Sequence, residues 1–118
     1  KGEVDEALKL QKERLKTNKR LGDLDGIAAA SYDIAQIEIQ QQDWQSAFEH
    51  LSESYTINMK LGRLDGICMV GIDLGQILCA SGNAESGLEI LTRSRDGFLK
   101  LGRPDYAQHV EGIIAQFS

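Results

Sequence analysis

Three copies of one heptad decide the fold: Leu21-Gly22-Asp23-Leu24-Asp25-Gly26-Ile27 returns as Leu61-Gly62-Arg63-Leu64-Asp65-Gly66-Ile67 and again as Leu101-Gly102-Arg103-Pro104-Asp105-Tyr106-Ala107. The copies follow one another at an offset of about 40 residues, without a gap. A fixed period of this length is the signature of a repeat architecture. Each repeat is then one supersecondary unit that buries its apolar face against its neighbours.

Within each repeat, apolar residues recur at the three- and four-residue steps of an amphipathic helix. The first helix of the repeat carries them at Ile27, Ala30, Ile34, Ile37, at Ile67, Val70, Leu74, Ile77, and at Ala107, Val110, Ile114, Phe117. The second helix carries them at Leu8, Leu15, Leu21, at Phe48, Leu51, Tyr55, Leu61, and at Leu88, Leu91, Phe98, Leu101. The pattern predicts an all-α fold of antiparallel helix pairs, with short turns near 42–43 and 82–83.

The recurring heptad marks the join between two repeats. Its glycines, Gly22, Gly62 and Gly102, are expected to end the preceding helix in a left-handed conformation, which glycine adopts without a Cβ clash. Pro104 suits the first position of the next helix. The carboxylates that follow, Asp25, Asp65 and Asp105, are expected to face the free amides and the positive end of that helix.

The length of 118 residues is enough for one small domain. We therefore expect a single repeat domain over residues 1–118. It would hold the second helix of a partial repeat in 1–22, repeats in 23–62 and 63–102, and the first helix of a partial repeat in 103–118.

A formal net charge of -5 disfavours nucleic acid and anionic membranes as partners and favours a basic or neutral one. The most apolar stretch, Ile67 to Ala80, is too short to span a membrane. Cys68 and Cys79 would lie roughly 16 Å apart on one helix, too far for a disulfide. These features predict a cytoplasmic protein.

Residues that could carry catalysis do not cluster in the sequence. His50 and His109 lie on different helix types and have no cysteine or carboxylate set at ligand spacing, so neither a metal nor a cofactor is expected. No serine, histidine and acid arrangement and no phosphate-binding glycine loop stands out, because the glycine clusters are explained by helix ends. We expect a protein that is not an enzyme.

Small residues recur where two helices of a repeat would cross. They are Ala35, Gly75 and Ala115 in the first helix, and Ala7, Ala47 and Gly87 in the second. With these residues and the period, the whole chain resembles the tetratricopeptide repeat family, in the longer variant found in Pins-type adaptors and bacterial regulators. The resemblance implies a right-handed superhelical solenoid whose first helices line the concave wall.

The same resemblance implies a peptide-binding groove on that concave wall. Its side chains would be Tyr32, Asp33, Gln36, Gln40, Met69, Ile72, Asp73, Gln76, His109 and Gln116. Glutamine can pair with the backbone of an extended peptide, and aspartate would select a lysine or arginine. The chain would then be a scaffold that binds a peptide of a partner protein. The alternative is that these polar residues solvate an open groove or bridge neighbouring helices.

The order of the helices suggests a further contact. The apolar residues Ala107, Val110, Ile114 and Phe117 would lack a following helix, and Leu8 and Leu15 a preceding one. Two chains could complete each other head to tail, in a heterologous contact. The function would then be architectural, with no peptide ligand. The other explanation is a fragment whose adjoining helices are missing.

Overall fold

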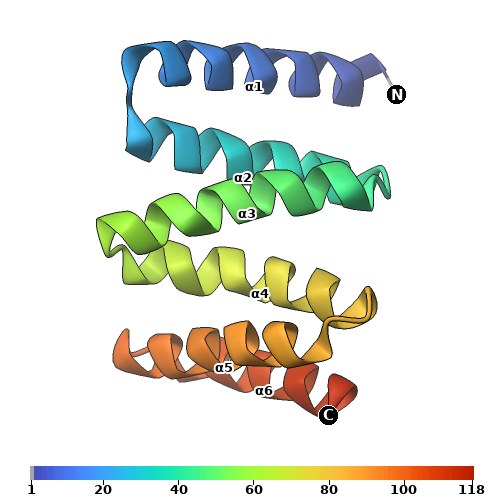
Figure 1. The fold of residues 1–118 in the computed structure, drawn as a ribbon, viewed down its shortest axis with the longest axis vertical. Helices are drawn as coiled ribbons and strands as arrows, with labels where there is room; N and C mark the ends of the chain where they lie inside the picture. The colour runs from blue at the N-terminus through green and yellow to red at the C-terminus, as the bar shows by residue number, and fades with distance from the viewer. Residues whose placement is uncertain (1) are drawn as a thin grey trace. The chain divides into compact units, whose positions relative to one another are not determined.

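The structure is a computed structural model that describes residues 2–118, and it is all-helical (Figure 1). Lys1, where the expected first repeat would begin, lies outside the described residues. The helices are α1 (Gly2–Leu21), α2 (Leu24–Gln40), α3 (Trp44–Leu61), α4 (Leu64–Ala80), α5 (Ala84–Lys100) and α6 (Pro104–Phe117). No strand occurs between residues 2 and 118. The prediction of an all-α fold is confirmed.

Glycine ends the helices at the joins between repeats, as the heptad predicts. Gly22, Gly62 and Gly102 have φ angles of 69°, 68° and 72°. At the first join the Gly22 N–H donates to the Lys19 carbonyl at 3.2 Å, and the next amide donates to the Asn18 carbonyl at 3.0 Å. These bonds satisfy carbonyls at the helix end that have no partner within the helix.

Helix starts are partly as predicted. Asp25, Asp65 and Asp105 lie in the first turns of α2, α4 and α6, and α6 begins at Pro104. The side chain that caps α2 is a different one: Asp23 Oδ1 accepts the Gly26 N–H at 3.0 Å. An N-cap carboxylate reaches the amides of the following turn better than one already inside the helix.

The contacts of the chain divide it into two compact units, one up to Asn58 and the other from Met59 to Ser118. In the first unit, α1 packs on α2. Its core contains Leu15, Ile27, Ala30 and Ile34, with Leu8 packed against them.

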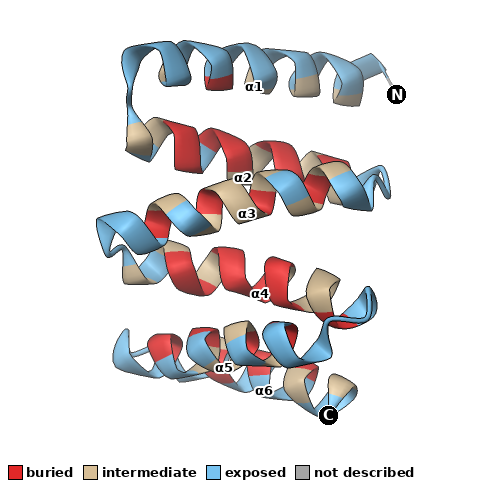
Figure 2. Cartoon of the chain, viewed as in Figure 1, coloured by how far each residue is buried: buried red, intermediate tan, exposed pale blue. Residues whose placement is uncertain are grey.

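In the second unit, α5 packs on both α4 and α6. Buried residues concentrate on one side of each helix (Figure 2). The core of this unit holds Cys68, Ile72, Cys79, Leu91, Phe98, Ala107, Val110 and Ile113.

Two glycines allow α4 and α5 to approach closely, as the small-residue pattern predicts. A Cβ on Gly75 would lie 2.6 Å from Leu91 Cγ, and one on Gly87 would lie 2.7 Å from the Gly75 carbonyl oxygen. Ala35 and Ala47 are fully buried in the first unit. Ala7 and Ala115 are exposed instead, because no described helix covers that side of α1 or α6.

Two expectations about apolar residues are wrong. Leu21, Leu61 and Leu101 are exposed, because each lies at a helix end where the chain turns away. The apolar residues of α6 have partners: Ala107 and Val110 are buried, and Ile114 and Phe117 pack against the same core. Their stripe faces the rest of the second unit, because α6 packs on α5 and also contacts α4.

Candidate functional site

The expected groove residues of the first unit lie on α2, on the side away from its core. Tyr32, Asp33 and Gln36 are half-buried and Gln40 is exposed, whereas Ile34 and Ala35 between them are fully buried. At 100° per residue, Asp33 and Gln36 fall on one face of the helix. Each of these residues has a fixed place on an ordered helix.

Asp33 is also engaged by α1. Its Oδ2 lies 3.9 Å from Arg14 Nη1, and both side chains are about half exposed, at 46% and 53%. An ion pair of this length in solvent contributes little to stability, on the order of 0–1 kcal/mol. The contact gives Asp33 a bridging role between α1 and α2.

In the second unit, the expected residues lie on α4 and α6, which contact each other. Asp73 and Gln76 are half-buried, and the Gln76 side-chain amide donates to the Ile72 carbonyl of its own helix at 3.2 Å. Gln76 thus holds its side chain along α4. His109 and Gln116 are exposed on α6.

The two apolar members of the expected groove contribute differently. Ile72 is buried in the core of the second unit, and Met69 packs against that core while remaining half-buried. Ile72 therefore offers little surface to a ligand. Met69 is the better candidate for contact with an apolar side chain.

A buried acid was missed by the sequence reasoning. Glu38 is 2% exposed, and its Oε1 lies 2.7 Å from His50 Nδ1. The same ring nitrogen is 3.1 Å from the Ser46 carbonyl oxygen. Two acceptors at one nitrogen require that Nδ1 carries the proton. The signal was present in the sequence, because Glu38 follows Ile34 by four residues on the buried stripe of α2.

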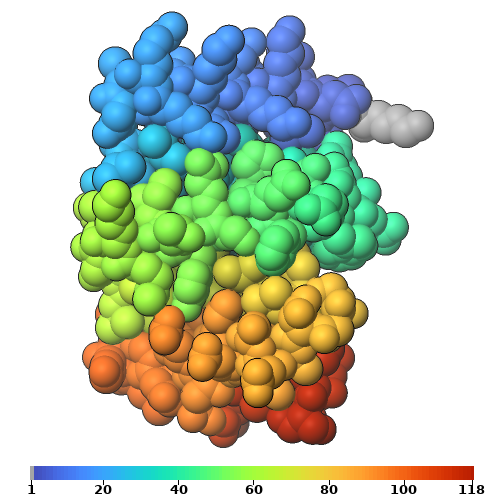
Figure 3. Space-filling model, in the orientation of Figure 1, coloured from blue at the N-terminus to red at the C-terminus, as the bar shows by residue number. Residues whose placement is uncertain are grey.

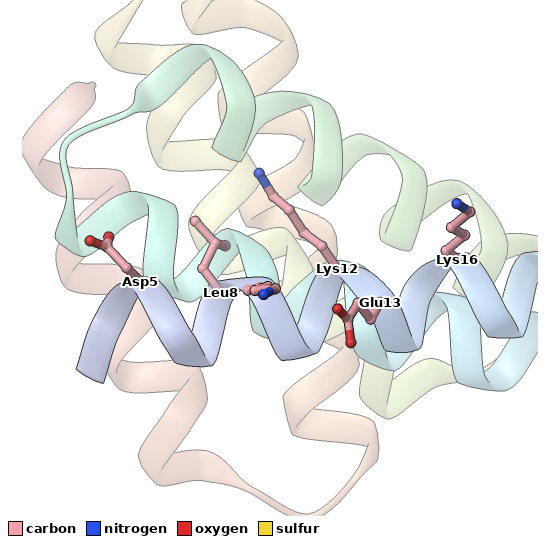
Figure 4. A pocket seen from close by; sticks show the side chains of 6 residues that line it. Asp5, Leu8, Lys12, Glu13 and Lys16 are labelled. Atoms are coloured by element: carbon pink, nitrogen blue, oxygen red, sulfur yellow. The ribbon is translucent and has the colours of Figure 1, made fainter. Parts of the chain in front are cut away.

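A second missed feature is a basic segment of α1. Residues 9–20 contain six Lys or Arg and one Glu, whereas residues 21–59 contain seven Asp or Glu and no Lys or Arg. A hollow of about 420 Å³ lies on α1, lined by Asp5, Leu8, Lys9, Lys12, Glu13 and Lys16 (Figure 4). In the space-filling view, side chains of α1 stand open at the surface (Figure 3). The formal net charge of -5 for the whole chain gives no sign of this local excess of positive charge.

Burial raises the pKa of both thiols. For Cys68 the nearby Asp65 carboxylate adds to the effect of burial. Both cysteines are free and buried. A raised pKa keeps the thiol protonated and unreactive, so these residues act as small core side chains.

The surface charges of α5 and α6 form local pairs. Arg95 Nη1 lies 2.7 Å from Glu111 Oε1, and this bond is the main cause that raises the pKa of Arg95. At the start of α6, hydrogen bonds from the Arg103 guanidinium lower the pKa of Asp105 below its ordinary value. Arg103 also stacks on Tyr106, 4.4 Å from the ring centroid.

In the part of the chain that the structure describes, no three metal-ligating side chains lie together. None of the helices described combines the length and the apolar character that crossing a membrane requires. Comparison with known proteins found no family model and no curated protein that matches the sequence.

Proposed function

We propose that the chain is a non-catalytic, cytoplasmic interaction module that binds a peptide segment of a partner protein on its α2, α4 and α6 faces. Each unit carries its own row of side chains. The row of the first unit is Tyr32, Asp33, Gln36 and Gln40. The row of the second unit is Met69, Asp73, Gln76, His109 and Gln116.

One observation carries this proposal. An aspartate and a glutamine three residues apart are half-buried on α2, as Asp33 and Gln36, and again at the equivalent places on α4, as Asp73 and Gln76. Both pairs lie beside fully or nearly fully buried apolar residues, which fix their helices. Side chains on rigid elements can present donors and acceptors at a constant spacing, which lowers the entropic cost of binding.

The chemistry of these side chains defines the ligand. A glutamine amide has both donors and an acceptor, so it can bond to the backbone of an extended chain whatever its sequence. An aspartate accepts only, and it favours a lysine or arginine of the ligand. Because Arg14 already lies beside the Asp33 carboxylate, a basic side chain of the ligand would share or displace that contact.

The tetratricopeptide resemblance and its solenoid arrangement belong to the same proposal. Glycine-ended helices, short turns between paired helices and the close approach at Gly75 and Gly87 support it. The faces named above are assigned from that resemblance, in which the first helices line the concave wall.

The test is a library of extended peptides passed over the immobilised chain, with binding measured for the selected peptides by fluorescence anisotropy. We expect selected peptides to contain Lys or Arg. Gln76→Ala should weaken their binding to the second unit about tenfold, and Gln36→Ala should do the same in the first unit, for the loss of one or two hydrogen bonds each.

A matched control keeps the experiment specific. Gln41→Ala and Gln45→Ala change exposed glutamines at the turn into α3, and they should leave the affinity within about twofold. Binding that survives both groove variants, or that weakens equally in the controls, would contradict the proposal.

A further inference from the structure

The contact between Arg14 and Asp33 places a cation of the chain itself at the row of side chains that we assign to a basic ligand. Arg14 Nη1 on α1 lies 3.9 Å from Asp33 Oδ2 on α2. We propose that Arg14 regulates the first unit: it competes with a lysine or arginine of the peptide for Asp33 and so lowers the affinity for basic peptides. This competition presupposes the peptide site proposed above.

Helix α1 supplies the cations that pair with acids of the first unit. Residues 21–58 contain seven Asp or Glu and no Lys or Arg. Besides Arg14, Lys19 of α1 binds an acid of this segment, because its Nζ lies 3.1 Å from Glu53 Oε2 on α3. Glu53 Oε1 also accepts the Ser31 hydroxyl at 3.1 Å. A basic ligand therefore approaches a unit in which α1 already pairs two carboxylates with cations.

Arg14 is held near Asp33 by the packing of its helix. Helix α1 lies alongside α2 (Figure 1), and Leu15, the next residue of the chain, is buried against Ile34 and its neighbours in the core. A cation that is tethered in this way has a high effective concentration at the carboxylate. The cation of a ligand must displace the guanidinium or bind beside it, and the two positive charges repel each other in either case.

The size of the effect follows from the exposure of the pair. The side chains of Arg14 and Asp33 are 53% and 46% exposed. An ion pair in this environment is weak and is screened by salt. Arg14 should therefore change the affinity for a basic peptide by about threefold, and at most by about fivefold. A contact of this strength adjusts binding without preventing it.

The second unit has a different residue at the equivalent position. One repeat after Asp33 the chain has Asp73, but one repeat after Arg14 it has Ser54. Ser54 is buried, and its hydroxyl donates to the Ala28 carbonyl oxygen at 2.9 Å. A serine carries no charge, so competition by a residue at this position is specific to the first unit.

The test is fluorescence anisotropy with a lysine-containing peptide from the library, in a chain that carries Gln76→Ala so that the first unit dominates binding. Adding Arg14→Gln should lower the dissociation constant about threefold. Arg14→Glu should lower it further, because a second carboxylate then attracts the lysine. The gain from Arg14→Gln should disappear at about 1 M salt, where the Debye length is only about 3 Å.

Two controls separate competition at Asp33 from a change in net charge. Lys16→Gln removes the same charge about 200° around α1 from Arg14, at the hollow of that helix. It should leave the dissociation constant unchanged. A peptide with glutamine in place of its lysine should bind equally to the chains with and without Arg14→Gln, because it has no cation to compete. Circular dichroism should show that every variant keeps its helices.

The outcomes separate the competition from the peptide site itself. Binding that depends on Gln36 but is not strengthened by Arg14→Gln overturns the competition and leaves the proposed function intact. An equal gain for Lys16→Gln, or for the peptide without lysine, overturns it in the same way. If no lysine-containing peptide binds either the unchanged chain or Arg14→Gln, the proposed function fails, and the competition fails with it.

Discussion

Two serines at equivalent positions illustrate how one hydroxyl stabilises a helix pair and another does not. Ser54 Oγ donates to the Ala28 carbonyl oxygen at 2.9 Å, across the contact of α3 and α2. Ser94 Oγ is buried in the second unit and has no partner among the residues described. Ser54→Ala should lower the free energy of unfolding by about 1–2 kcal/mol, and Ser94→Ala should leave it unchanged or raise it slightly. Urea titration followed by circular dichroism measures both; equal losses would show that the Ser54 bond contributes nothing specific.

Backbone strain can be tested in the same way at the turns inside the repeats. Gln42 has a φ of 61°, in the left-handed region, whereas the equivalent residue of the next repeat is Gly82, with a φ of 94°. Gln42→Gly should raise the free energy of unfolding by up to about 1 kcal/mol, because glycine carries no Cβ penalty there. Gly82→Gln should lower it by about 1 kcal/mol or more, and thermal melts of both variants check the pair. A Gln42→Gly variant that melts earlier would show that the glutamine side chain outweighs its backbone strain.

At the scale of helices, the approach of α4 to α5 depends on residues without side chains. Gly75→Ala should lower the free energy of unfolding by about 1–3 kcal/mol, because the new Cβ would overlap Leu91. Alanine is the better helix former by roughly 1 kcal/mol, so the clash must exceed that gain. Gly112→Ala on α6 is the matched control, since a Cβ there meets nothing within 4 Å. It should stabilise, and a Gly75→Ala variant that is also more stable would mean that the helices are farther apart.

The helices and their ends could be predicted because their signals are local. A glycine at a left-handed position and an apolar step of three or four residues act within one or two turns, so they can be read along the sequence. The exposure of Leu21 and Leu101 could not be predicted, because periodicity does not show whether a neighbouring helix covers a given side of the helix. The apolar stripe of α6 is predicted correctly. The prediction that no helix packs on it is wrong, because α5 does.

The same contrast between local signals and packing applies to the candidate site residues. The positions of Asp33, Gln36 and Asp73 on one side of their helices follow from spacing alone. The burial of Ile72 depends on the helices packed around it, which spacing does not show. The contact of Glu38 with His50 joins two helices through side chains whose pairing no local rule predicts.

At the scale of the whole chain, charge is distributed unevenly although its sum is modest. The basic residues 9–20 precede an acidic segment without Lys or Arg, and Arg14 and Lys19 already bind Asp33 and Glu53 of that segment. Acidic and glutamine side chains on α2 and α4 therefore suit a basic peptide, and α1 suits an acidic surface.

The proposed ligand face is tested most directly by nuclear magnetic resonance of the nitrogen-15-labelled chain, titrated with a lysine-containing extended peptide selected from the library. We expect the largest shift changes on α2, α4 and α6, around Asp33, Gln36, Asp73 and Gln76, and at the Gln76 side-chain amide. Shift changes confined to α1, α3 or α5 would contradict it.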